Sequence, residues 1–368
     1  MSMVSTTSAE EITRRDALAE RLFTGLLEAL ELLSVQLGVE LGLYSGLRRD
    51  GPADAHELAE RAGIHPRYAR EWLEQQAAAG ILDSTGGDAD PERRRFALPA
   101  GHAEALLDHD SPAAVHAVAP AVIGIASVLD RLATSYRTGG GVPYAAFGPD
   151  LRHGIAGMNR PLFTNDLAVW LAAAPTVDRH LRSRARPEIL DVGCGTGWSS
   201  VALARAYPEA RVHGIDLDGA SVDEARRNAT EAGVDGRVDF EVRDAVTVDE
   251  LDGRYDLVCI FEALHDMAHP VRTLAKLGRV LTEGGAVLVA DERVCETFTA
   301  PAEFNDRLMY AWSVLHCLPA TMAEQPSIAT GTVLRPSTLR RYAAEAALPR
   351  VEELAVDNDF WRLYLLQP

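Results

Sequence analysis

Hydrophobic positions near the start of the chain recur at helical spacing. Between residues 16 and 49, leucines fall at steps of three and four, which places them on one helical face: Leu22, Leu26, Leu30, Leu33 and Leu37. Two helices joined by a short turn at Gly63 come next, the second over 65–79, and the arms of a hairpin follow at 80–82 and 93–98. This order of elements predicts a winged helix.

Helical spacing continues over residues 111–185, with one interruption. The stretch RTGGGVPYAAFGPD, at 137–150, has three consecutive glycines beside a proline, which is typical of a mobile or tightly turning loop. Helical spacing resumes after it. We therefore expect a helical connector that carries a lid loop.

From about residue 186 the pattern changes to short apolar strands that alternate with helices. The expected strands lie at 188–193, 211–217, 238–244, 255–261 and 286–292, and two more finish the chain after residue 350. The alternation predicts an α/β fold with a mostly parallel sheet of seven strands and helices on both faces. We expect an N-terminal helical and winged-helix domain over 1–110, the connector over 111–185, and a Rossmann-like domain over 186–368.

Charge argues against a nucleic-acid partner. The net charge of −18 repels a phosphate backbone. Within the predicted winged helix, residues 48–95 hold eight Arg against ten Asp and Glu, so this segment lacks the basic footprint that DNA recognition requires. We assign the winged helix to dimerisation or to assembly of a substrate pocket.

Composition favours a soluble, reduced protein. Apolar residues make up 47% and charged residues 24% of the chain, no apolar run approaches the ~20 residues of a membrane span, and the polar N-terminus lacks the pattern of a secretory signal. We expect a cytoplasmic protein with no membrane partner. The cysteines show no paired spacing such as CxxC, which predicts reduced core thiols: Cys194, Cys259, Cys295 and Cys317.

The stretch EILDVGCGTGW, at 188–198, has the glycines of a strand-to-helix turn that approaches an adenosine cofactor. A dinucleotide fingerprint has the spacing GxGxxG, but Trp198 stands where its third glycine belongs. A phosphate-binding P-loop is excluded, because no Lys followed by Ser or Thr closes the loop. The glycines therefore serve another cofactor.

ILDVGCGTG resembles the first motif of class I S-adenosylmethionine-dependent methyltransferases. In that family an acid ending the second strand binds the ribose diol, here Asp216 in HGIDLD, and an acid ending the third strand contacts the adenine amino group, here Asp244 in VRDA. YDLVCIFEALHDM is similar to the fourth strand and the loop that faces methionine and substrate. S-adenosylmethionine carries a sulfonium and no phosphate, so acidic strand ends suit it. The resemblance implies these cofactor contacts: Asp191, Gly193, Gly195, Gly197, Asp216, Leu217, Asp244, Ala245, Phe261 and Glu262.

Nearly the whole chain resembles small-molecule O-methyltransferases of the plant and polyketide type, which form homodimers through their N-terminal part. The resemblance implies S-adenosyl-L-methionine as cofactor, a small-molecule methyl acceptor and methylation at oxygen. Two alternatives stay open. One keeps the fold and cofactor but methylates nitrogen or carbon, or catalyses a reaction other than methylation. The other is a transcription regulator that senses S-adenosylmethionine, which would need a basic DNA-binding surface.

His265 is the candidate general base. It lies in LHDM, where plant O-methyltransferases carry His-Asp-Trp with a catalytic histidine, and Asp266 would orient a ring. Met267 in place of Trp departs from that pattern, so a structural or substrate-contacting histidine is the alternative. Asp291, Glu292 and the His265–Asp266 pair would offer ligands to a divalent ion, but metal-ligand spacing is absent and we expect no metal.

The acceptor pocket is expected from two segments. The insertion at 297–319 has an apolar face, which fits either a core stripe or a cavity for a flat substrate: Met309, Trp312 and His316. The connector and the fifth strand add further candidates: Tyr144, Phe147, Met158, Asn159, Phe163 and Asp291.

Overall fold

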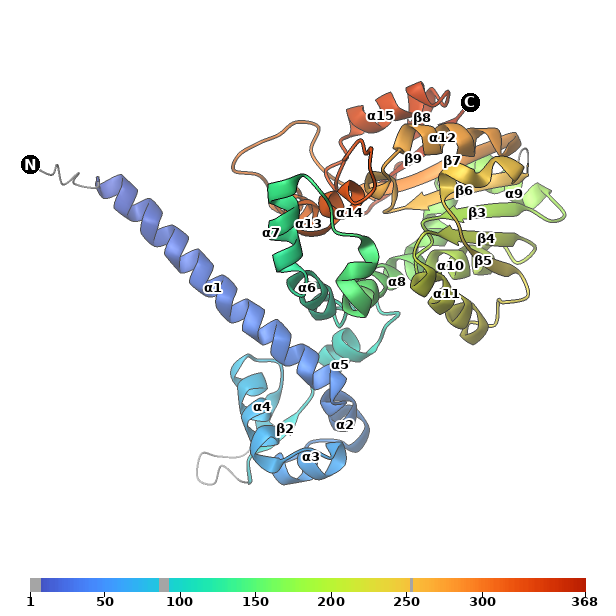
Figure 1. Cartoon of the computed structure of the whole chain (residues 1–368). Coiled ribbons are helices and arrows are strands. Elements are labelled where there is room, and N and C mark those ends of the chain that lie inside the picture. Colours follow the sequence, from blue (N-terminus) through green and yellow to red (C-terminus); the bar gives the residue numbers. More distant parts are fainter. Residues whose placement is uncertain (1–7, 86–92, 252–253) are drawn as a thin grey trace, which may run out of the picture. The chain divides into compact units, whose positions relative to one another are not determined.

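The structure is a computed structural model that describes residues 8–85, 93–251 and 254–368. The chain divides into two compact units, Met1–Ala119 and Pro120–Pro368 (Figure 1). Most of the helical segment expected as a connector belongs to the second unit. The three-part division at residues 110 and 185 stays a prediction.

The first unit begins with a long helix whose start is defined by Ser8. The Ser8 hydroxyl accepts a hydrogen bond from the Glu11 N–H at 3.2 Å, and the Glu11 carboxylate accepts one from the Ser8 N–H at 2.9 Å. The helices and strands of this unit are α1 (Ala9–Glu40), α2 (Leu43–Asp50), α3 (Ala55–Ala62), α4 (Pro66–Ala78), β1 (Asp83–Thr85), β2 (Arg95–Ala97) and α5 (Ala100–Leu107). Gly42, in the left-handed conformation with φ 66°, separates α1 from α2 within the region expected to be helical.

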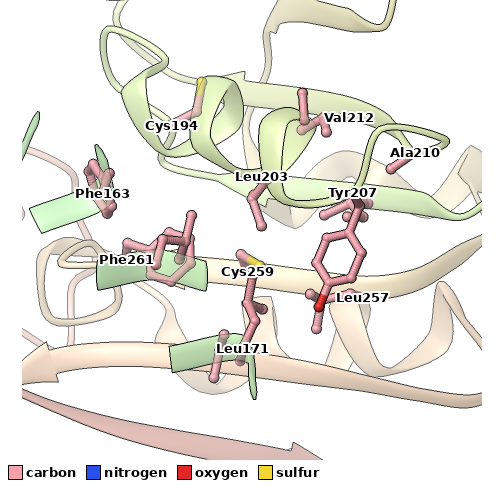
Figure 2. Packing of buried hydrophobic residues seen from close by; sticks show 14 of the residues in the cluster. Phe163, Leu171, Cys194, Leu203, Tyr207, Ala210, Val212, Leu257, Cys259 and Phe261 are labelled. Atoms are coloured by element: carbon pink, nitrogen blue, oxygen red, sulfur yellow. The ribbon is translucent and has the colours of Figure 1, made fainter. Parts of the chain in front are cut away.

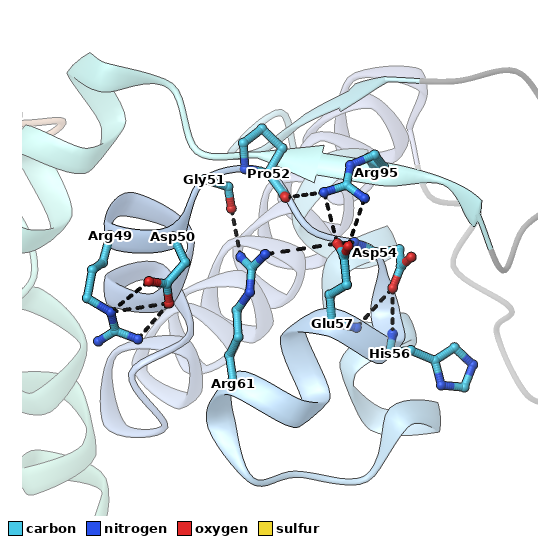
Figure 3. A network of polar contacts seen from close by, with 9 residues as sticks. All are labelled: Arg49, Asp50, Gly51, Pro52, Asp54, His56, Glu57, Arg61 and Arg95. Atoms are coloured by element: carbon cyan, nitrogen blue, oxygen red, sulfur yellow. Dashed lines mark hydrogen bonds and ion pairs between the residues drawn. The ribbon is translucent and has the colours of Figure 1, made fainter.

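The winged helix is confirmed, with its first strand three residues later than expected, at β1. Strands β1 and β2 pair antiparallel. Arg95 of β2 lies 2.9 Å from the Glu57 carboxylate of α3 and donates to the Pro52 carbonyl, while Arg61 donates to the Gly51 carbonyl (Figure 3). These polar contacts attach the hairpin to the helix pair.

Leucines on α1 are largely exposed in this structure. Leu22 is 63% and Leu30 56% exposed. By length and composition α1 is able to cross a membrane, with a mean hydropathy of 1.5 over its most apolar window. The expectation that no apolar run approaches the length of a membrane span is therefore corrected for α1. Glu28 and Glu31 lie within its apolar stretch, but the stretch remains apolar on average. Within the described part of the chain, the bent pair formed by α6 (Val118–Ala126) and α7 (Leu129–Thr138) passes the same test when taken together.

The second unit is built on a seven-stranded sheet in the order β5-β4-β3-β6-β7-β9-β8. Its strands are β3 (Glu188–Val192), β4 (Arg211–Asp216), β5 (Val238–Val242), β6 (Tyr255–Phe261), β7 (Leu281–Glu292), β8 (Arg350–Glu353) and β9 (Trp361–Gln367). The first five are parallel, and β9 pairs antiparallel with both β7 and β8. The predicted fold class is therefore confirmed.

Helices cover both faces of this sheet. The helices that follow α5 along the chain are α6 (Val118–Ala126), α7 (Leu129–Thr138), α8 (Gly148–Ala172), α9 (Pro175–Ser183), α10 (Trp198–Ala206), α11 (Gly219–Glu231), α12 (Pro270–Arg279), α13 (Phe304–Trp312), α14 (Leu318–Met322) and α15 (Pro336–Glu345). Successive residues of β6 point to opposite faces: Leu257 and Cys259 pack with α8 to α11, as Figure 2 shows in part, whereas Val258 and Ile260 pack with α12 and α15. With both faces covered, the strand ends are the place for a ligand.

A smaller apolar cluster joins α6, α7 and α8 to the segment after β7. Phe147 and Leu151 are buried in it, and Met158, Trp312 and Leu315 pack against it. The chain between α13 and α14 forms a π-helical turn, Ser313–Cys317. Such turns often occur at functional sites, and this one carries His316 and Cys317.

Candidate active site

The site is built at the carboxyl ends of β3, β4, β6 and β7. Strand β3 pairs with β4 on one side and with β6 on the other, so the chain leaves the middle of the sheet in opposite directions at this point. Ligands of open α/β sheets bind where the strand order reverses in this way. The predicted cofactor and base residues follow these strand ends.

The glycine loop after β3 is packed on one side and open on the other. Gly193 has φ 71°, and a Cβ atom there would lie 2.6 Å from the Ala263 Cβ. Gly195 has φ 51°, and a Cβ atom there would meet nothing within 4 Å. The loop thus needs glycine to approach β6 and leaves free space beside its middle residue.

Asp191 holds the loop from beneath. It is buried, and its Oδ2 accepts hydrogen bonds from the hydroxyls of Ser199 at 2.6 Å and Ser200 at 2.5 Å. Burial raises the pKa of Asp191 to about 6, against the lowering effect of the two hydroxyls. Asp191 therefore links the first turn of α10 to β3. Its expected contribution to cofactor binding would be to hold this loop in position.

Asp216 joins the loop to β4. Its Oδ2 accepts the Gly195 N–H at 2.9 Å and its Oδ1 accepts the Asp218 N–H at 2.8 Å, while burial raises its pKa. Asp218 caps α11 through the Ser221 N–H and forms an ion pair with Arg152 of α8 at 2.9 Å. These bonds hold the Asp216 carboxylate beside the open side of the glycine loop.

The next two strand ends supply the other expected cofactor residues. Leu217 is 64% exposed directly after Asp216. Asp244 accepts the Val246 N–H at 2.9 Å, and Ala245 beside it is buried. Leu217 thus presents an exposed apolar side chain after β4, and Asp244 is held by the backbone after β5.

Glu262 follows β6 in a left-handed conformation, with φ 52°, which is uncommon for a residue other than glycine. Its carboxylate accepts a hydrogen bond from the Asn159 amide of α8. Burial raises the pKa of both Glu262 and Glu292, which hydrogen-bond each other. Each buried carboxylate therefore disfavours the charged form of the other, because two buried like charges at hydrogen-bonding distance are unfavourable.

His265 is enclosed by acids. It is 2% exposed, its Nδ1 lies 2.9 Å from Asp291 Oδ1, and its Nε2 lies 3.5 Å from Asp266 Oδ1. Burial alone would lower the pKa of His265, but the carboxylates of Asp291 and Asp266 raise it well above its ordinary value. Asp291 was predicted as an acceptor contact, and this role stays a prediction; in the structure its buried Oδ1 contacts His265 Nδ1 and accepts the Glu292 N–H.

Aromatic rings surround His316. Its ring centroid lies 5.7 Å from that of Tyr144, 4.8 Å from that of Phe147 and 6.3 Å from that of Trp312. His316 Nε2 is buried and has no hydrogen-bond partner among the residues that the structure describes, Nδ1 lies 3.4 Å from Cys317 Sγ, and burial lowers the pKa of the ring. The structure thus brings together four residues predicted for the acceptor.

Other predicted residues lie in or against the core. The Phe163 ring packs 5.5 Å from that of Phe261, which Figure 2 shows, and 5.6 Å from that of Trp361, and its role as an acceptor contact stays a prediction. Phe261 is 5% exposed beneath Glu262, and Met309 is 5% exposed. Large apolar side chains at this edge fill the sheet packing before they reach a ligand.

Sequence reasoning missed the residues that support this site. Ser199 and Ser200 bond Asp191, and Arg152 bonds Asp218 across 66 residues. The capping role of Asp218 could have been predicted from the sequence, because an acid directly before the first residue of a helix, here Gly219, is a typical N-cap. Nothing local in the sequence marks Arg152 or the approach of Cys317 to His265, because both depend on tertiary packing.

Comparison with known proteins identifies both parts of the chain. Residues 184–335 match a family model described as a methyltransferase domain, and residues 28–107 match one described as an Rv2258c-like winged HTH domain. The chain therefore carries a methyltransferase domain that follows a winged helix-turn-helix domain.

A curated relative is 27-O-demethylrifamycin SV methyltransferase of Amycolatopsis mediterranei. It is 33% identical over 150 residues, which make up 39% of this chain and 52% of the relative. The chain spans about half, or less, of the length of the curated relatives that it matches.

Solved structures share the fold over almost the whole chain. The mitomycin 7-O-methyltransferase MmcR has a TM-score of 0.64 at 21% identity and covers 97% of this chain and 100% of its own. Human N-acetylserotonin methyltransferase, solved in complex with SAM, has a TM-score of 0.66 at 16% identity and covers 100% and 99%. At these identities the likeness shows the fold.

Proposed function

We propose that this chain, with its methyltransferase domain behind a winged helix-turn-helix domain, transfers a methyl group from S-adenosylmethionine to a small molecule, at oxygen. The observation that carries the proposal is the bonding of the glycine loop to Asp216 at the reversal of strand order, with free space beside Gly195. The names of two relatives, 27-O-demethylrifamycin SV methyltransferase and mitomycin 7-O-methyltransferase, support a small acceptor that is methylated at oxygen.

The residues at the strand ends fit this cofactor. Asp216 and Asp244 supply carboxylates for the ribose and the adenine amino group, and Leu217 supplies an exposed apolar face beside them. Glu262, held by Asn159, supplies an acid at the end of β6 for the amino-acid part. S-adenosylmethionine supplies a methyl group activated by its sulfonium. The acids suit a cation and would repel a phosphate, which agrees with a net charge of −18.

In this proposal the chain contributes to catalysis mainly by positioning the two reactants and, to a smaller extent, by accepting a proton. Holding two reactants in line is worth on the order of 7–11 kcal/mol, and a placed general base contributes about 10²–10⁴-fold. His265 Nε2 would accept the acceptor's proton, and Asp291 would hold the ring through Nδ1 and stabilise the charge that forms. Because the pKa of His265 is raised, its base form is populated at a higher pH than that of an ordinary histidine.

The acceptor would bind at the aromatic group around His316. A buried polar atom without a partner costs about 1–3 kcal/mol, and a ligand that bonds it recovers that cost. His316 Nε2 is such an atom, and the rings of Tyr144 and Trp312 flank it. We infer a flat acceptor with a polar group at one edge. A nitrogen or carbon acceptor would use the same aromatic group.

We further propose a cytoplasmic homodimer formed through α1. The exposed leucines of α1 require a cover, and Glu28 and Glu31 in the middle of the apolar run favour a protein cover over a bilayer. A charged side chain at a bilayer centre costs at least about 2.5–3.5 kcal/mol. For the winged helix we propose assembly and no DNA contact, since Arg67 and Arg70 of α4 form ion pairs with Glu71 and Glu74.

Calorimetric titration with S-adenosylmethionine tests the cofactor assignment. Asp216→Ala removes the carboxylate that bonds the Gly195 N–H, and we expect the binding isotherm to disappear or weaken at least tenfold. Asp239→Ala, at an exposed acid of β5, is the matched control and should bind as the unsubstituted chain does. Unchanged affinity in a folded Asp216→Ala variant would reject the assignment. Absence of binding by the unsubstituted chain would reject the proposed function.

A further inference from the structure

Three unlike donor atoms converge beside the π-helical turn. Among residues 8–85, 93–251 and 254–368, His265, Asp266 and Cys317 form one group in which a nitrogen, an oxygen and a sulfur all lie within 4.8 Å of one another. His265 and Asp266 come from the turn after β6, and Cys317 comes from the turn between α13 and α14. Segments about 50 residues apart thus contribute to one small volume.

Their spacing approaches that of a tetrahedral ion. Zinc binds nitrogen and oxygen at about 2.0–2.2 Å and sulfur at about 2.3 Å, so donors around it stand roughly 3.3–3.6 Å apart. His265 Nε2 and Asp266 Oδ1 are already 3.5 Å apart. Cys317 Sγ lies within 4.8 Å of both atoms.

Two further features prepare these atoms for an ion. Asp291 bonds His265 Nδ1 at 2.9 Å, which turns Nε2 toward the group, and a carboxylate behind a histidine is the usual second partner of a metal-ligating imidazole. Asp266 Oδ1 is buried and has no hydrogen bond to any of the described residues, so the oxygen that faces His265 is available as a ligand. A thiolate and a carboxylate together balance the charge of a divalent cation.

We propose that His265 Nε2, Asp266 Oδ1 and Cys317 Sγ bind one divalent ion of the zinc class. Mixed nitrogen, sulfur and oxygen donors select such borderline ions over magnesium or calcium, which prefer oxygen alone. Three protein ligands leave one position of a tetrahedron open. The ion takes the same Nε2 that a general base would use, so binding of the ion and proton transfer by His265 exclude each other.

Cobalt(II) titration tests this site without any methyl acceptor. Cobalt in place of zinc gives a near-ultraviolet thiolate-to-metal band, and we expect that band to saturate at one ion per chain. Cys317→Ser should abolish the band, and Cys295→Ser, at an exposed thiol elsewhere, should retain it. Absence of the band in the unsubstituted chain, its survival in Cys317→Ser or its loss in Cys295→Ser would each overturn the proposal.

Zinc affinity measured by calorimetry gives a second readout if Cys317→Ser does not fold. Asp266→Asn lies at a partly exposed side chain, and Asp291→Asn changes only the partner of His265. We expect a loss of about 10–100-fold in zinc affinity for Asp291→Asn, as for other partners of metal-bound histidines. Unchanged affinity in both variants would contradict the site. Because no cofactor or acceptor is present, this outcome is separate from that of the proposed methyl transfer.

Discussion

His265 and Asp291 form the tightest charged pair of the site, and its chemistry follows from their burial. Nδ1 to Oδ1 is 2.9 Å, and both side chains are almost fully enclosed. Replacing Asp291 by Asn keeps an oxygen that accepts the Nδ1 hydrogen bond but removes the charge. The pKa of His265 should therefore fall.

The stability of the chain should report this change. A histidine whose folded pKa is raised contributes stability that is fully present below its unfolded pKa, about 6.5, and is lost as pH rises through the folded pKa. We expect unfolding free energies from urea titrations to decline over that interval in the unsubstituted chain, and to decline less in Asp291→Asn. Asp239→Asn, an exposed control, should follow the unsubstituted curve. Parallel curves for Asp291→Asn would show that the charge of Asp291 does not act on His265.

At the residue scale, the sequence predicted what lies in local motifs. Asp216 ends β4, and Glu262 and His265 lie just after β6; the apolar runs of both strands were readable, so the common edge of these residues was predictable. The contact of Asp291 with His265 was not predictable, because a strand-ending acid has the same local sequence pattern whether it faces a ligand or a buried imidazole. The site roles of these residues stay predictions until ligand binding is measured.

At the element scale, the glycine loop after β3 makes two separable demands on its residues. Gly193 needs both a left-handed backbone and the absence of a Cβ near Ala263, whereas Gly195 needs only the left-handed backbone. Gly195→Ala should cost about 1–2 kcal/mol of backbone strain. Gly193→Ala should cost that and an overpacking term of about 1–3 kcal/mol.

A double variant separates the two terms. Gly193→Ala with Ala263→Gly removes the methyl group that the new Cβ would meet at 2.6 Å, so it should recover the overpacking part but not the backbone part. Unfolding free energies of the four variants give the coupling. If Ala263→Gly does not improve Gly193→Ala, the contact between the loop and the turn after β6 is not what limits this position.

Elements were predicted well where periodicity was long and poorly where packing decides. Strands β3 to β6 began where the apolar runs did, and α10 began at Trp198, as expected. β7 starts five residues before its expected start, since its first residues are less apolar. The helical spacing of Met309, Trp312 and His316 gave no sign of the π-helical turn. These residues are three and four positions apart in the sequence, and the extra residue that a π-helical turn contains does not alter that spacing.

At the scale of the whole molecule, charge and exposure define which faces meet partners. The ion pairs of α4 and the net charge of −18 were readable from composition, and they agree with a winged helix that assembles the protein. The apolar stripe of α1 could also be predicted from the sequence, but the partner that covers it could not. A stripe of leucines looks the same in sequence whether it meets a core, a second copy or a membrane.

Substitution of this stripe distinguishes its partners. Leu26 and Leu30 are 51% and 56% exposed on one face of α1, and Leu26→Lys with Leu30→Lys places two charges there. Burying such charges in an apolar interface without partners is strongly unfavourable, so we expect a dimer to become a monomer in light scattering coupled to size exclusion. The winged-helix core contributed by α2, α3 and α4 does not include these leucines, so the variant should remain folded.

The control places the same charges on the opposite face. Thr24→Lys with Glu31→Lys leaves the leucine stripe intact, and this variant should remain a dimer. A monomeric unsubstituted chain would contradict the proposed dimer directly. If that monomer also floats with anionic vesicles, and Leu26→Lys with Leu30→Lys abolishes flotation, the cover of α1 is a membrane surface, because only a partner that contacts the stripe responds to charges placed on it.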